Sequence, residues 1–248
     1  MGSITVVFIL LTTLVTAFIS GIFGMAGGLI LMAVLTALVS VAMAMVIHGT
    51  LQMVANGYRA FLLRDAMVWP VVRAYLVGAA LGILGLSLVR WVPDRQVVYA
   101  LLGLTGLLVW IPRHLLDLDI QKPGQAMLAG GLVQGLNTLA GVAGPLLDLF
   151  FVQTDMTRQQ IVATKALTQT VSHLIKVGFW GLPLIQLAGW AAVPPVWLFA
   201  LAIPLSLSGT WLGGQVLDRL SDHSFRRWMK GLITLISLVL LLRAAGAF

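Results

Sequence analysis

Long apolar stretches separated by short polar joints constrain this chain more than any other feature of its sequence. The chain has 248 residues, of which 60% are hydrophobic and only 9% are charged. A helix needs about 20 apolar residues to cross the hydrocarbon of a bilayer, so there is room for about eight to ten helical segments and little else. Soluble domains carry about 25% charged residues. The composition therefore excludes a soluble globular enzyme and predicts an all-α integral membrane protein.

The charged residues that remain are mostly basic, and cysteine is absent. Without cysteine the chain can form no disulfide, thiolate metal site or cysteine nucleophile. The 15 Lys and Arg residues outnumber the 8 acids, which gives a net charge of +7. Basic residues of membrane proteins gather in cytoplasmic loops, so we expect the lipid bilayer as a partner and no nucleic acid. The apolar N-terminus lacks the basic region of a cleaved signal and is expected to be the first membrane element.

Two features of the chain recur at a shift of 117 residues: a glycine-rich pentapeptide and a stripe of polar residues. The matched positions are residues 24–28 with 141–145, and Gln52, Asn56 and Arg59 with Gln169, His173 and Lys176. Several glycine and polar matches at one offset indicate an internal duplication, which is a common architecture of secondary transporters. We therefore divide the single membrane domain into a first repeat, 1–120, and a second repeat, 121–248.

The basic residues in the polar joints distinguish two topologies. If each glycine-rich element crossed the membrane once, these 12 residues would divide 7 to 5, which gives almost no orientation. If each element turns back at its glycines, 9 residues lie on one face and 3 on the other. The nine are Arg64, Arg73, Arg113, Lys122, Arg158, Arg219, Arg226, Arg227 and Lys230, and the three are Arg90, Arg95 and Arg243. The positive-inside rule favours this second topology.

The hairpin topology has three consequences. Each repeat consists of a broken glycine-turn hairpin followed by three transmembrane helices, and parity makes the two repeats inverted relative to each other. Residues 125–152 are too few for two full crossings, so we expect two half-helices that meet near mid-membrane. We also expect a multi-pass protein with both termini outside the cytoplasm. The alternative, in which the glycine-rich elements cross the membrane fully, stays open at this point.

The two glycine motifs are candidates for anion binding. Glycine permits a sharp turn and a close backbone approach, and a helix that starts at such a break points unpaired N–H groups and a positive dipole end at the turn. Broken backbone at membrane depth is tolerated where it lines a cavity. The predicted substrate-binding residues of the breaks are Gly24, Gly27, Gly28, Gly141, Gly144 and Pro145. The alternative is that the glycines form small-residue packing faces between helices.

Two polar stripes on apolar helices are the second candidate. Their members are spaced i, i+4, i+8 and i+11, which places them on one helix face. The stripes are His48, Gln52, Asn56 and Arg59 in the first repeat and Lys165, Gln169, His173 and Lys176 in the second, with Thr168 beside them. Ionisable groups at membrane depth usually face a cavity, and cations with amide donors favour a small anion. Alternatively, Arg59, Lys165 and Lys176 extend from the helix ends to the interface.

Asp148 is the one acid well inside an apolar segment. It either forms an ion pair with Lys165, so that the site can bind a proton when the anion leaves, or serves as a structural counter-ion. His48, Arg59, Asp148 and Lys176 are therefore candidates for ion coupling or for the transport path, and proton coupling stays open. The chain has no HExxH, Walker or GxSxG motif, so we expect no metal site, no cofactor and no enzymatic activity.

Together these motifs resemble the TauE/SafE-type sulfite exporters, which are grouped with the toluene sulfonate uptake permeases. The resemblance rests on residues 21–28 in the first half and on residues 131–135, 141–145 and 162–176 in the second. It implies an integral inner-membrane protein with two related halves that moves sulfite, sulfonates or related organosulfur anions.

The functional hypothesis is a secondary transporter, more specifically an exporter, of a small sulfur-containing anion such as sulfite or an organosulfonate. The two halves would alternate access to an anion bound at the half-helix starts, with Lys165, Gln169 and Gln52 as side-chain donors. Two alternatives belong to other classes: a membrane scaffold or regulatory subunit without transport activity, and an intramembrane enzyme, which the missing motifs disfavour. The sequence leaves the anion, the direction of transport, the coupling ion and the oligomeric state undetermined.

Overall fold

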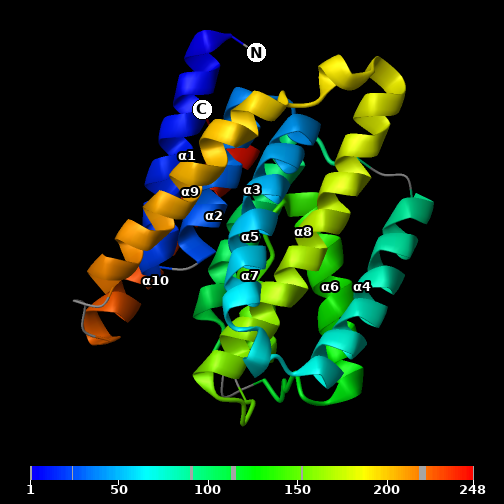
Figure 1. Ribbon diagram of the computed structural model, residues 1–248, viewed down its shortest axis with the longest axis vertical. Coiled ribbons are helices and arrows are strands. Elements are labelled where there is room, and N and C mark those ends of the chain that lie inside the picture. The colour runs from blue at the N-terminus through cyan, green and yellow to red at the C-terminus, as the bar shows by residue number, and fades with distance from the viewer. Residues whose placement is uncertain are drawn as a thin grey trace.

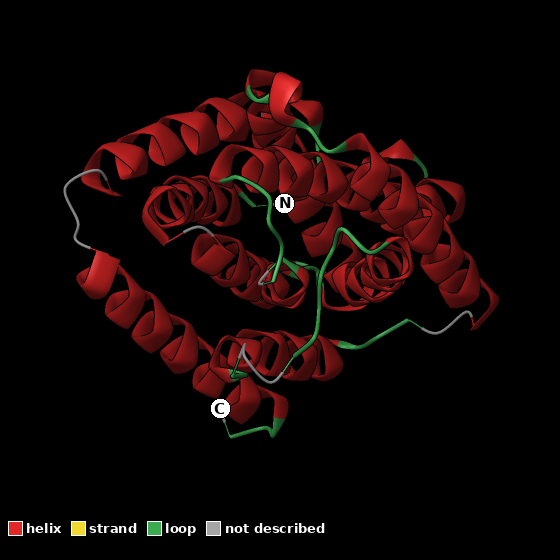
Figure 2. Cartoon of the chain, turned by 90° about the horizontal axis from the view of Figure 1, so that it is seen from below, coloured by secondary structure: helices red, strands yellow, loops and turns green. Residues whose placement is uncertain are grey.

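The described secondary structure is entirely helical (Figures 1 and 2). A computed structural model of the protein describes residues 2–23, 25–89, 92–112, 116–151, 153–217 and 222–247. Its ten α-helices are α1 (Ser3–Phe23), α2 (Met25–Leu38), α3 (Val41–Leu62), α4 (Trp69–Val89), α5 (Arg95–Leu107), α6 (Pro123–Ala140), α7 (Gly144–Phe150), α8 (Arg158–Ala188), α9 (Val196–Leu217) and α10 (Asp222–Ala244). Three short 3₁₀ turns are η1 (Arg64–Ala66), η2 (Leu108–Trp110) and η4 (Trp190–Ala192). The prediction of an all-α fold is confirmed.

Among the described residues, four helical stretches are long and apolar enough to cross a membrane. They are Ser3–Ile22, Trp69–Val89, Arg158–Ala188 and Trp190–Val216. Large apolar side chains cover the outer surface of the bundle, among them Leu88, Leu187 and Val196, which are 76%, 86% and 84% exposed. An apolar surface of this extent needs hydrocarbon around it. The fold is that of a multi-pass membrane protein.

Local sequence signals set several helix starts. The longest helix, α8, begins with a capping box: the Thr157 side chain accepts from the backbone N–H of Gln160, and the Gln160 side chain accepts from the backbone N–H of Thr157. Ser40 and Asp94 cap α3 and α5 by accepting from the N–H three residues later. Asp94 and Thr157 stand in polar joints between the apolar stretches, whereas Ser40 lies within an apolar stretch.

Helices from the two halves of the chain pack together in pairs: α1 along α9, α4 along α6, α3 along α8 and α5 along α10. Glycine makes the closest of these approaches possible. A Cβ on Gly78 of α4 would overlap the Met127 carbonyl oxygen of α6, and a Cβ on Gly213 of α9 would overlap the Phe18 carbonyl oxygen of α1. These glycines lie outside the two broken motifs and serve helix packing.

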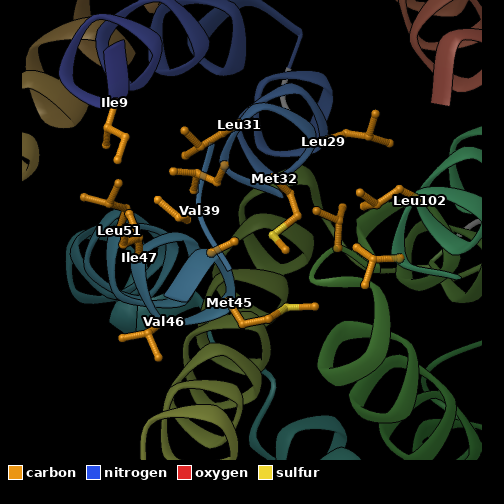
Figure 3. Close-up of a cluster of buried hydrophobic side chains, with 14 of the residues drawn as sticks. Ile9, Leu29, Leu31, Met32, Val39, Met45, Val46, Ile47, Leu51 and Leu102 are labelled. Carbon is orange, nitrogen blue, oxygen red and sulfur yellow. The ribbon is translucent and has the colours of Figure 1, made fainter. Parts of the chain in front are cut away.

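The first glycine-rich element is a hairpin. Gly27, near the start of α2, lies against the Thr16 carbonyl oxygen and the Ser20 side chain of α1, and Figure 3 shows Leu31 of α2 near Ile9 of α1, so α2 runs back along α1. With 14 residues, α2 is about 21 Å long, which is less than the about 30 Å of hydrocarbon in a bilayer. The arms are unequal, because α1 has 21 residues.

The second glycine-rich element also turns back, but its arms are not the two half-helices that the sequence suggested. The backbone N–H of Ile120, just before α6, donates to the carbonyl of Phe150 at the end of α7, so the chain returns to the end at which α6 began. Helix α6 has 18 residues and α7 only 7. The break lies late in the element because the left-handed Gly141, with a φ of 86°, ends α6 there.

Helices α3 and α8 run antiparallel, and their polar stripes meet where Lys176 contacts His48. Gly49 of α3 lies beside Val177 and Lys176 of α8, whereas Gly57, two turns later, lies beside Thr170.

Figure 1 marks both chain ends in its upper part. The division into two inverted repeats and the side of the membrane on which the termini lie stay predictions, and Arg90, Arg113 and Arg219, which entered the count of basic residues, lie outside the described residues.

Candidate functional site

A cavity of about 590 Å³ lies between the two helix breaks and the two polar stripes. Small-molecule sites usually measure about 300–1,000 Å³, so this cavity is large enough for a small anion with water around it. Both halves of the chain contribute to its wall. The helices that contribute are α1, α2, α3, α6, α7, α8, α9 and α10, together with η2.

Twelve of the sixteen residues predicted for binding, coupling or the path line this cavity. They are Gly27, Gly28, His48, Gln52, Asn56, Arg59, Gly144, Pro145, Asp148, Lys165, Gln169 and His173. The structure thus brings the second glycine of each motif and most of both stripes to one space. Their role in binding a substrate stays a prediction.

The other four predicted residues do not line the cavity. Gly24 lies outside the described residues. Thr168 is buried and donates its hydroxyl to carbonyl oxygens of its own helix, those of Thr164 and Lys165. Gly141 forms the end of α6, with the Met32 side chain against it. Lys176 is fully buried behind the wall, so it does not extend to the membrane interface.

Lys165 and Asp148 form an ion pair in the cavity wall. The Lys165 ammonium donates to the Asp148 carboxylate and so joins α8 to the short helix α7. The side chains are 25% and 19% exposed, respectively. The contact between Asp148 and Lys165, one of the two alternatives left open by the sequence, is therefore present, and among the described lining residues these two are the only acid and the only lysine.

Arg59 makes the cavity positive. In the antiparallel register that brings Gly49 beside Val177 and Gly57 beside Thr170, Arg59 of α3 lies at the level of Lys165 of α8. The two cations and Asp148 leave one net positive charge in the wall. Within the described part of the chain, the side chains of Arg59, Gln52, Asn56 and Gln169 form no hydrogen bond. Their donors are available to a ligand.

A second polar cluster lies at the inner end of the cavity. The Lys176 Nζ lies 2.9 Å from His48 Nδ1 and donates to the Gly141 carbonyl oxygen at 2.8 Å, while His48 Nε2 lies 3.1 Å from the Gly28 carbonyl oxygen. His173 lies edge-on to His48, with 5.6 Å between the ring centroids. The cluster thereby connects the two glycine breaks through side chains of α3 and α8.

The cavity is also lined by polar residues that the sequence reasoning missed. They are Thr13, Thr16 and Ser20 of α1, Asn137 of α6, Ser172 of α8, and Ser206 and Thr210 of α9. The Asn137 amide donates to the Ser172 carbonyl oxygen at 3.1 Å, and its Oδ1 has no partner. The available signal was helical spacing of small polar residues, as in Thr13, Thr16 and Ser20, on otherwise apolar segments.

The cavity occupies only part of the length of the helices. It follows α3 from His48 to Arg59 and α8 from His173 back to Ile161. Beyond His48, the preceding residues of α3 are buried in an apolar cluster, where Figure 3 shows Met45, Val46 and Ile47. The cavity is therefore closed on the side where α3 begins and extends toward the end where α3 ends and α8 begins.

Hydrogen-bond donors and cations set the chemistry of this cavity. Within the described residues, no three His, Asp or Glu side chains gather as they would around a metal ion. Positive charge and unused N–H donors are chemically suited to an anion with several acceptor oxygens.

Comparison with known proteins identifies one family. The family model described as sulfite exporter TauE/SafE matches residues 9–240, which is nearly the whole chain. No curated protein and no solved structure matches the chain.

Proposed function

Because the chain belongs to the TauE/SafE sulfite exporter family, a family of membrane transporters, we propose that it is a secondary transporter that exports a small sulfur-containing anion such as sulfite or an organosulfonate. The observation that carries this proposal is the cavity between the helix breaks, with its net positive charge and its unused donors.

The anion binds between α3 and α8. Arg59 supplies a planar pair of N–H donors that matches two oxygens of a sulfite or sulfonate group. Gln52 and Gln169 line the same cavity from the two stripes and donate amide N–H groups to the remaining oxygen. Lys165 approaches the anion once its ion pair with Asp148 loosens, so the arriving anion competes with the carboxylate for the ammonium.

The helix breaks contribute unequally to binding. Helix α2 has 14 residues and starts beside Gly27 and Gly28 in the cavity wall, so it can direct backbone N–H groups and a positive dipole end at the anion. Helix α7 has 7 residues, and a helix of two turns adds little dipole. In this proposal Gly144 and Pro145 shape the wall, and the side chains of α8 provide most of the attraction on that side.

The pairing of the helices supports alternating access between two related halves. If α1–α5 correspond to α6–α10, the pair α1–α9 becomes the pair α6–α4, and the pairs α3–α8 and α5–α10 each map onto themselves. An inverted duplication would give this pattern and the antiparallel crossing of α3 and α8. The cavity extends toward the end of α3 at which Arg64 lies, which is the predicted cytoplasmic side, so this state would receive the anion from inside.

Thermal unfolding with candidate anions tests the proposal. Purified protein in detergent would be heated with sulfite, methanesulfonate, thiosulfate or acetate at two pH values. A transporter gains stability from an anion that binds its folded state, in proportion to the logarithm of the anion concentration above the Kd. We expect stabilisation by sulfite or methanesulfonate that exceeds the effect of acetate at equal ionic strength. Equal effects of all four anions would contradict specific binding and favour a scaffold or regulatory subunit.

A further inference from the structure

Lys176 is a buried ionisable group to which the function proposed above gives no role. Lys176 is fully buried, lies outside the cavity wall, and is in contact with both helix breaks: directly through the Gly141 carbonyl oxygen and indirectly through His48, which reaches the Gly28 carbonyl oxygen. A change at either break can therefore reach the Lys176 amine through these contacts.

The hydrogen bonds limit the charge that this pair can carry. A carbonyl oxygen only accepts, so the His48 Nε2 that contacts Gly28 carries the hydrogen. Neutral His48 then accepts at Nδ1 from the Lys176 nitrogen. A doubly protonated His48 would direct a second N–H at that nitrogen, which could accept it only as an uncharged amine. The pair therefore holds at most one positive charge.

Within the described residues, no acidic group offsets that charge. Helices α2, α6 and α9, which pack against α3 or α8, contain no acidic, basic, histidine or tyrosine residue. Helix α4 carries Arg73, which is exposed, and Tyr75, whose hydroxyl lies 2.9 Å from the Ser172 hydroxyl. The Asp148 carboxylate is bonded to Lys165. The short turn η1, with Arg64 and Asp65, lies at the far end of α8, near Thr164.

The remaining titratable groups near the pair are themselves basic or neutral. They are His173 of α8, which lies edge-on to His48, and Arg59 and Tyr58 of α3, which lie near the opposite end of that helix. An ammonium buried among such groups loses its hydration without gaining a counter-charge. An uncharged amine, in contrast, uses its two N–H groups on the two acceptors present, His48 Nδ1 and the Gly141 carbonyl oxygen.

An anion in the cavity changes this balance. His48 and His173 line the cavity in front of Lys176, so a bound anion brings negative charge close to the amine. We propose that Lys176 binds a proton from water when the anion binds and releases it when the anion leaves; the inference rests on the anion-transport function proposed above. Proton and anion binding reinforce each other by the same factor, because coupling between two sites is reciprocal.

The same contacts identify the proton as the coupling cation. In transporters with broken helices, carbonyl oxygens freed at the breaks coordinate a sodium ion or surround a proton site. Here the Gly141 carbonyl, at the left-handed end of α6, already accepts from the Lys176 nitrogen. The protein's own amine occupies this position, so anion binding requires no sodium. A doubly charged anion that moves with one proton still carries one negative charge outward, in the direction that the membrane potential favours.

Proton uptake on anion binding tests this role. Calorimetric titrations of the full-length protein with methanesulfonate, which stays singly charged throughout the neutral range, would be run in two buffers that differ in ionisation enthalpy. For the wild type we expect uptake that approaches one proton per anion at alkaline pH, and a Kd that rises by up to about tenfold per pH unit. Replacing sodium salts by choline salts should leave the Kd unchanged.

Two substitutions separate the charge of Lys176 from its titration. Lys176→Arg keeps a permanent positive charge, so it should bind the anion without proton uptake and with a Kd that does not change with pH. Lys176→Gln has no charge and should bind the anion at least tenfold more weakly. Lys122→Arg and Lys122→Gln, in the exposed loop before α6, are matched controls and should behave as the wild type. With sulfite, which itself titrates, Lys176→Arg gives the baseline for proton uptake by the ligand.

The outcomes distinguish this inference from the proposed function. Anion binding by the wild type without proton uptake, binding that requires sodium, or undiminished uptake in Lys176→Arg would overturn the role of Lys176 and leave anion transport intact. Absence of binding of both methanesulfonate and sulfite at every pH would contradict the proposed function and this inference together. Even if both Lys176 variants fail to fold, anion binding by the wild type without proton uptake overturns the role of Lys176.

Discussion

The Lys165 ammonium donates to the Asp148 carboxylate, and this pair sets the charge that an entering anion meets. Lys165 lies on the long helix α8, whereas Asp148 lies one turn into the short helix α7, directly after the glycine break. Because the carboxylate holds the ammonium, the proposed anion would compete with Asp148 for Lys165.

Asp148→Asn should strengthen anion binding. The substitution keeps the size of the side chain, removes its negative charge and frees the Lys165 ammonium. The Kd for sulfite should fall roughly three- to tenfold, on the order of 1 kcal/mol for an ion pair that water partly screens. The sulfite concentration that half-saturates the thermal stabilisation measures this change.

Asp117→Asn is the matched control for Asp148→Asn. Asp117 also pairs with a lysine, Lys122, at 3.4 Å, but its side chain is 83% exposed in a loop. We expect no change in the Kd for sulfite. If Asp148→Asn leaves the Kd unchanged or weakens binding, the carboxylate does not compete with the anion.

Arg59→Ala should weaken anion binding by at least about tenfold, because two charge-assisted hydrogen bonds to the anion are lost. Arg59→Lys should recover only part of the affinity, since an ammonium cannot form the paired contact of a guanidinium. Titration of sulfite into the purified variants, followed by calorimetry, gives the Kd. Arg73→Ala, on an exposed position of α4, provides the control. Affinities of Arg59→Ala and Arg73→Ala that match within twofold would remove Arg59 from the site.

Gly213→Ala should destabilise the contact between α1 and α9, because the added methyl group would overlap the Phe18 carbonyl oxygen. Overpacking of this kind costs roughly 1–3 kcal/mol. The neighbouring Gly214→Ala places its methyl group in open space, and alanine favours a helix over glycine, so this variant should be neutral or slightly stabilising. Melting temperatures of the two variants in the same detergent make the comparison, and equal values would contradict the close helix contact.

Gly141→Ala should lower stability more than Gly246→Ala. Both glycines lie at the C-terminal ends of helices with positive φ angles, 86° and 74°, so both substitutions carry a backbone cost of about 1–2 kcal/mol. Only Gly141 is crowded, with the Met32 side chain against it and its carbonyl bonded to Lys176. The difference between the two melting temperatures therefore isolates the packing at the break, and no difference would mean that Met32 moves aside without cost.

The sequence predicted which residues share a helix face better than it predicted how far each residue lies from the cavity. The i, i+4, i+8, i+11 spacing correctly placed the polar members of each stripe on one helix face, and the structure brings Gln52, Asn56 and Gln169 into one wall. Spacing defines a face and not a distance from the cavity. Lys176 shares the face of Gln169 and His173, yet it lies behind the wall because the Gly141 carbonyl and His48 bind its amine.

Two further features could not be derived from the sequence. The lengths of α6 and α7 depend on where the chain adopts a left-handed angle, and a motif with several glycines, from Gly135 to Gly144, allows more than one such position. The sequence did not indicate that Thr13 and Thr16 of α1 line the cavity. A threonine hydroxyl can bond to a carbonyl of its own helix, as both do here, so it needs no polar surroundings. Such residues are compatible with lipid, a helix interface or a cavity.

Sulfite flux through reconstituted protein tests the central claim most directly. Proteoliposomes loaded with sulfite would carry the wild type, Lys165→Ala, or the control Lys122→Ala, with equal amounts of folded protein checked by gel filtration. A Lys165→Ala/Asp148→Ala double variant removes both partners, in case an unpaired acid impairs folding. The proposed function predicts efflux well above protein-free liposomes for the wild type and Lys122→Ala, and efflux at the protein-free level for both Lys165 variants. Wild-type efflux no faster than that of empty liposomes, or unchanged efflux in the Lys165 variants, would contradict it.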